Sequence, residues 1–129
     1  MPVAVVQKVF LGTSESTGIT IANNATSTSS EIDVLGNDTT EGRIRVFLKY
    51  TGTVAAGSIQ VTFYPSRVTG QPYAAQAPVN FTVNPINGTQ SIFLGDLMTS
   101  RYMTATVFNN AVGASLTNVF LAVQAIQES

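Results

Sequence analysis

The chain has no cysteine, no histidine and no tryptophan among its 129 residues. It therefore cannot form a disulfide, a tetrahedral zinc site or a catalytic triad that depends on cysteine or histidine. Charged residues make up only 10 % of the sequence, and the net charge is −1. Nucleic-acid-binding domains usually carry a clear basic excess, so nucleic acid is not an expected partner. A net charge near zero also favours association between copies.

The sequence also has little that would direct a chain to a membrane. A secretory signal needs a basic region followed by an apolar run of about 7–15 residues. The stretch MPVAVVQKVFLG (1–12) is interrupted at Gln7 and Lys8. No stretch approaches the roughly 20 apolar residues that span a bilayer. We therefore expect a protein without a signal peptide that is made in the cytoplasm and has no membrane partner.

Threonine, serine and asparagine supply 37 residues, which favours strands and turns over helices. Apolar residues alternate with polar ones in short runs bounded by turn residues. Strands are expected near residues 3–11, 17–23, 31–35, 43–51, 58–64, 78–84, 90–95, 101–109 and 117–126. This pattern predicts an all-β fold with a single domain over 1–129: an antiparallel β-sandwich of about eight strands, jelly-roll or Ig-like. Residues 1–11 are expected to form an N-terminal arm or an edge strand.

Two hairpins follow from the turn residues. Asn87-Gly88 suits a type I′ turn, which would set Val83 opposite Ile92 and Phe81 opposite Leu94. A second hairpin would close through GNDTTEG (36–42). Its expected pairs are Val34 with Ile44, Ile32 with Val46 and Asp33 with Arg45, the last joining opposite charges across two strands.

Four of the seven acidic residues lie between positions 31 and 41, beside the basic strand 43–49. The favoured interpretation is a hairpin with ion pairs and a solvated loop. The alternative is a calcium loop built from Asp33, Asn37, Asp38 and Glu41, since hard cations prefer clustered oxygen ligands. The spacing is not that of an EF-hand. The glycine-containing stretch GTSESTG (12–18) lacks the lysine and helix of a phosphate loop, so no cofactor and no catalytic or metal-binding residues are expected.

Aromatic residues recur on the strand faces that should be exposed to water. In RIRVFLKY (43–50) the core-facing set is Ile44, Val46, Leu48 and Tyr50. Phe47 falls on the opposite face, with Arg43 and Arg45. The same alternation predicts outward positions for Tyr64, Phe93, Tyr102, Phe108 and Phe120. Either bulges or loops cover these rings, or other chains do, because monomers rarely expose large apolar patches.

The second half of the chain shows a strand ending in FYP, a proline-rich excursion (65–78), an NGTQ turn, and RYMTATVFNN followed by a small-residue loop. In these features residues 58–115 resemble small β-rich structural proteins of tailed-bacteriophage virions. The resemblance implies a decoration or cement protein on a capsid, or a component of a tail or fibre. It implies no catalytic residues.

The predicted function is accordingly a non-enzymatic virion structural protein that binds or bridges capsid subunits. Its expected partners are the major capsid protein or other virion subunits and further copies of itself, and its expected location is the virion. The alternative is a ligand-binding module, such as a sugar-binding or receptor-binding tip, with Tyr73 in GQPYAAQ as the candidate platform. The predicted interface residues are Arg43, Arg45, Phe47, Tyr64, Tyr73, Phe93, Phe108 and Phe120.

Overall fold

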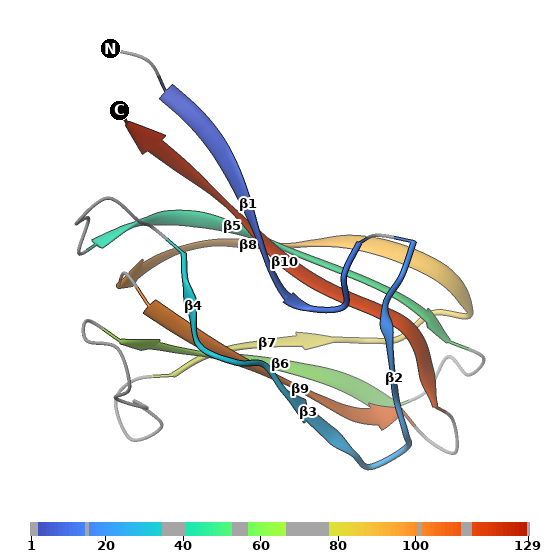
Figure 1. Ribbon diagram of the computed structural model, residues 1–129. Coiled ribbons are helices and arrows are strands. Elements are labelled where there is room, and N and C mark those ends of the chain that lie inside the picture. The colour runs from blue at the N-terminus through green and yellow to red at the C-terminus, as the bar shows by residue number, and fades with distance from the viewer. Residues whose placement is uncertain are drawn as a thin grey trace.

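The computed structural model describes residues 3–14, 16–34, 41–52, 57–66, 78–100, 102–111 and 115–128. Within these ranges ten strands form two antiparallel sheets that lie one above the other (Figure 1). The strands are β1 (Val3–Leu11), β2 (Ile19–Ile21), β3 (Thr26–Thr28), β4 (Ile32–Asp33), β5 (Glu41–Gly52), β6 (Gly57–Ser66), β7 (Val79–Val83), β8 (Gly88–Ser100), β9 (Tyr102–Ala111) and β10 (Leu116–Glu128). The predicted all-β antiparallel sandwich is confirmed.

The strand order identifies the topology. The first sheet runs β1-β10-β5-β8, with β2 also paired to β10, and the second runs β3-β9-β6-β7, with β4 also paired to β9. From β4 onward the chain changes sheet at every connection except that between β6 and β7. Alternation between two layers, each with a path of four paired strands, is the arrangement of a jelly roll, whereas an Ig-like sandwich groups its strands differently. Of the two topologies considered, the chain adopts the jelly roll.

The inner faces of the two sheets form the core, and the strand faces predicted from alternation are confirmed there. Side chains at alternate positions of β5, β6, β9 and β10 are at most 1 % exposed. These are Ile44, Val46, Leu48, Tyr50, Ile59, Val61, Phe63, Met103, Ala105, Val107, Val119, Leu121, Val123 and Ala125. Phe63 makes edge-to-face contacts with Phe10 and Phe81, at centroid distances of 5.7 and 5.9 Å. Burial of this apolar surface is the main stabilising term.

The predicted hairpin at Asn87-Gly88 is wrong. β7 pairs with β6, so that Val83 lies opposite Ile59, whereas β8 pairs with β5 in the other sheet, so that Ile92 lies opposite Leu48. Gly88 does adopt a positive φ of 96°, but Asn87 does not, as a type I′ turn would require. Residues 84–87 instead carry the chain from one sheet to the other.

The second predicted hairpin is also wrong. β4 pairs with β9, where Ile32 lies opposite Met103 and Asp33 opposite Tyr102. β5 lies in the other sheet, between β8 and β10. Turn residues show where a chain reverses direction, but they do not show whether it returns to the same sheet or crosses to the facing one.

One strand, β3, lies inside the NNATSTSS stretch that was predicted as a turn cluster. Its two outward threonines leave no apolar alternation to detect. Buried polar groups hold this part of the chain on β9. Ser29 donates its N–H to the Ala105 carbonyl and accepts the Ala105 N–H on its Oγ, at 2.8 and 2.9 Å. Asn109, which is fully buried, donates from Nδ2 to the Ile21 carbonyl at 2.9 Å.

Candidate functional site

An apolar row crosses the outer face of the first sheet from one edge to the other. Residues directly opposite each other in antiparallel strands share a face. Val9 of β1 lies opposite Ala122 of β10, Ala122 lies opposite Phe47 of β5, and Phe47 lies opposite Phe93 of β8. The Phe47 and Phe93 rings are in contact, with centroids 5.6 Å apart. We call Val9, Ala122, Phe47 and Phe93 the apolar row.

A β-bulge in β8 sets the position of Phe93. The register against β5 shifts between Val46, which faces Gly95, and Phe47, which faces Phe93. Gly95 has a φ of 148°, a backbone angle that residues other than glycine rarely adopt. The extra residue bends the strand and places both Phe93 and Asp96 on the outer face, although they are three positions apart. Strict alternation would have put them on opposite faces.

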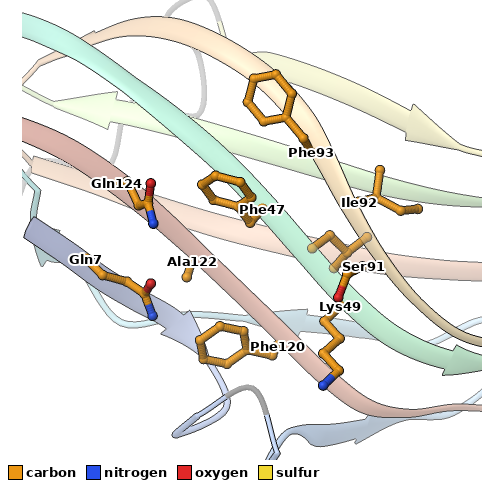
Figure 2. A pocket seen from close by; sticks show the side chains of 10 residues that line it. Gln7, Phe47, Lys49, Ser91, Ile92, Phe93, Phe120, Ala122 and Gln124 are labelled. Carbon is orange, nitrogen blue, oxygen red and sulfur yellow. The ribbon is translucent and has the colours of Figure 1, made fainter. Parts of the chain in front are cut away.

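Three residues of the apolar row, Phe47, Phe93 and Ala122, help to line a hollow of about 330 Å³ over β10, β5 and β8. Figure 2 shows Ala122 between Phe47 and Phe120, with Gln7 approaching from β1 and Phe93 on the far side of Phe47. Ala122 is only 1 % exposed, because the longer side chains around it stand higher, and it forms the floor. Phe93 is 54 % exposed and is the most prominent ring of this face.

Polar residues flank the apolar row on both sides. On one side Gln7 lies opposite Gln124, Gln124 opposite Arg45, and Arg45 opposite Asp96. Arg45 Nε and Asp96 Oδ1 are 3.6 Å apart, and both side chains are well exposed. The acidic partner of Arg45 is thus Asp96 and not the predicted Asp33. On the other side, Lys49 of β5 lies between Phe120 and Ser91.

Phe120 is on this outer face but is only 3 % exposed. The turn between β1 and β2 lies against the neighbouring backbone of β10. The Gly18 N–H donates to Asn118 Oδ1 at 2.7 Å, and a Cβ on Gly18 would come within 2.3 Å of the Asn118 carbonyl carbon. The chain itself therefore buries Phe120 and leaves almost none of its ring for a partner.

The outer face of the second sheet is rich in hydroxyl groups, and on β4 it carries Asp33, which lies opposite Tyr102. One row joins Thr28, Thr106, Thr62 and Asn80, and the next joins Thr26, Phe108, Gln60 and Thr82. Tyr64, beside them, lies opposite Thr104. The Thr62 hydroxyl bonds to the Asn80 side chain. Phe108 and Tyr64 are partly buried in this face.

The predicted interface residues therefore divide between two surfaces. Arg43, Arg45, Phe47, Phe93 and Phe120 lie on the outer face of the first sheet, and Tyr64 and Phe108 on that of the second. Tyr73, the candidate ligand platform, lies outside the described residues. Sequence reasoning missed Val9 and Ala122. Only the register of β1, β10 and β5 brings these small side chains beside Phe47.

The described residues contain no group of three or more acidic, histidine or cysteine side chains that could hold a metal ion. Of the proposed calcium ligands, Asn37 and Asp38 lie outside the described ranges. In the same part of the chain there is no helix long and apolar enough to span a bilayer.

No protein-family model matches the chain, and no curated protein shows significant similarity to it. A chain from Bacillus endospore appendages, described as disulfide-linked pili, is similar with a TM-score of 0.38 and 12 % identity, over 99 % of this chain and 93 % of that one. The present chain has no cysteine and so cannot share a disulfide linkage.

Two viral structures are also similar. A chain of Desmodium yellow mottle tymovirus has a TM-score of 0.39 and 11 % identity, over 98 % of this chain and 86 % of that one. A chain of the infectious bursal disease virus subviral particle has a TM-score of 0.29 and 11 % identity, over 96 % of this chain but only 40 % of that one. At these scores the likeness carries no argument about function.

Proposed function

We propose that the chain is a non-enzymatic structural protein of a virion, and specifically a decoration or cement protein that binds the capsid shell. One observation carries the proposal: both broad faces of the jelly roll hold aromatic rings where a free-standing sandwich would place charge. Phe47 and Phe93 lie on the first sheet, and Tyr64 and Phe108 on the second. A contiguous apolar patch rimmed by polar residues is typical of a protein-binding surface.

The composition of the two faces suits binding to a protein shell. Interfaces are enriched in aromatic residues and depleted in charged ones at their centres. The rows of the second sheet described above contain aromatic, hydroxyl and amide side chains only. Repeated subunits would strengthen such contacts, because binding at several sites of one lattice multiplies weak affinities. The resemblance of residues 58–115 to tailed-phage structural proteins supports the same role.

The proposal is tested with virus particles prepared without this protein and with the purified chain. The chain should bind the particles at a fixed number of sites, measured by co-sedimentation. Changing Tyr64 to Ser should weaken binding by about 30-fold or more, since truncating a buried interface aromatic often removes about 2 kcal/mol. Phe47→Ser is prepared beside it to test whether Phe47 belongs to an outer face. Thermal unfolding of each variant should remain close to that of the unchanged chain.

Ile86→Ser is the matched control, because Ile86 is also a large exposed apolar side chain, at 56 %, but lies in the β7–β8 connection. It should bind as well as the unchanged chain. The proposal fails if the unchanged chain does not bind the particles. If Phe47→Ser unfolds, then Phe47 belongs to the core, and the apolar row is not a binding surface.

A further inference from the structure

We propose that the outer face of the first sheet binds a second copy of this chain, face to face, about a two-fold axis that runs along the strands between β5 and β10. This inference extends the proposed structural role, but it concerns the purified chain and does not depend on a particle. It rests on the distribution of side-chain size and charge over the apolar row and the polar rows beside it.

Side-chain size is distributed unevenly along the apolar row. The two rings, Phe47 and Phe93, occupy β5 and β8, and the smaller Ala122 and Val9 occupy β10 and β1. A two-fold axis between β5 and β10 places the apolar row of one copy over the apolar row of the other. The half with large side chains then faces the half with small ones. Phe47 of each copy then lies above the hollow whose floor is Ala122 of the other copy, and Phe93 lies above Val9. Large side chains meet small ones throughout, as packing at interior density requires.

The charges agree with the same axis. This axis places the row of Gln7, Gln124, Arg45 and Asp96 over the same row of the other copy. Arg45 then faces Gln124 of the other copy, and Asp96 faces Gln7. An axis perpendicular to the strands would instead place Arg45 over Lys49, and like charges facing each other across an interface are unfavourable. Of these two axes, the one along the strands keeps like charges apart.

The available area indicates a dimer of moderate strength. Four strands about 4.8 Å apart, each contributing about nine residues of 3.4 Å, give a face of about 600 Å² per copy. The total of about 1,200 Å² is at the lower limit of specific interfaces, so a dissociation constant on the order of micromolar is expected. The dimer should therefore form and dissociate with concentration.

Sedimentation equilibrium of the purified chain over micromolar concentrations tests the dimer. The unchanged chain should approach twice its 13.6 kDa mass. Phe93→Ser should raise the dissociation constant about 30-fold or more. Ile86→Ser, which removes a side chain of equal exposure outside this face, should leave it unchanged. A chain that remains monomeric up to 1 mM, or an unchanged constant for Phe93→Ser, would overturn the proposal.

Cysteine cross-linking tests the axis, because the natural chain has no cysteine to interfere. Gln7→Cys and Asp96→Cys are prepared separately, mixed, and treated with a short bismaleimide. With facing sheets about 10 Å apart, the two thiols lie within reach across the axis, whereas two copies of Gln7→Cys are about 17 Å apart. The mixture should cross-link and Gln7→Cys alone should not. The reverse result would refute this axis.

These outcomes are separable from the proposed function. A monomeric chain that still binds particles would refute the dimer and leave the structural role intact. A dimer that binds no particle would refute the role and leave the dimer intact. Both single-cysteine changes are at exposed positions, so both variants should fold. Thermal unfolding of each variant checks this before cross-linking.

Discussion

The two outer faces of this jelly roll are made by the same alternation of side chains, yet they differ in chemistry. The face on β1, β10, β5 and β8 carries an unbroken apolar row. A polar row with an exposed ion pair between Arg45 and Asp96 lies on one side of it, and Phe120, Lys49 and Ser91 lie on the other. The face on β3, β9, β6 and β7 carries rows of threonine and amide side chains with three partly buried rings, Tyr64, Tyr102 and Phe108.

The difference arises from which strands become neighbours. The two rings of the apolar row lie opposite each other, and Phe47 also lies opposite Ala122. On the second sheet Phe108 lies opposite Thr26 and Gln60, and its ring is isolated among polar groups. Isolated rings favour a polar, hydrated contact, whereas a continuous row favours an apolar one. The same number of aromatic residues can therefore make two kinds of surface.

The largest loss of stability is expected when a ring on the inner face is truncated. This loss is the value with which truncations on the two outer faces are compared. Phe63 is fully buried and contacts Phe10 and Phe81. Changing Phe63 to Ala should lower the free energy of unfolding by about 3–5 kcal/mol, measured by urea denaturation. Phe93→Ser, at a position that is 54 % exposed, should lower it by far less when both are measured as monomers. Equal losses would mean that the inner and outer faces are not distinct.

An intermediate effect is expected where the turn between β1 and β2 packs against the backbone of β10. Changing Gly18 to Ala would place a Cβ 2.3 Å from the Asn118 carbonyl carbon, so the turn must move. A loss of about 1–3 kcal/mol in the free energy of unfolding is expected, as for other overpacked sites. Hydrogen exchange should show faster exchange at the Gly18 and Val119 amides than in the unchanged chain. A variant of unchanged stability would show that the turn does not pack tightly against β10.

The smallest effect is expected from the ion pair of the first outer face. Changing Asp96 to Asn removes the partner of Arg45, but both side chains are exposed and their closest distance is 3.6 Å. Exposed pairs of this kind contribute about 0.2–1 kcal/mol and are screened by salt. Thermal unfolding at low and high ionic strength should therefore show a small difference that salt removes. A larger, salt-independent loss would indicate that Asp96 has a structural role beyond the pair.

The sequence by itself determined the fold class and the direction in which most strand side chains point. Alternation has a period of two residues and is a local property, so Val46, Val61 and Val107 could be assigned to the core without knowledge of their neighbours. It also placed Phe47 and Phe93 on outer faces. It failed for β3, whose threonines carry no apolar signal, and beyond Gly95, where the bulge shifts the alternation.

Only the tertiary structure decided which strands pair and what the outer faces therefore contain. In a jelly roll most strands pair with partners far away in the sequence, so neither predicted hairpin formed, although Gly88 adopts the positive φ that its turn suggested. Val9, Ala122 and Phe47 are separated by long stretches of chain and become one row through the register of β1, β10 and β5. Register depends on the summed packing of two whole sheets, and no short segment of the sequence contains that information.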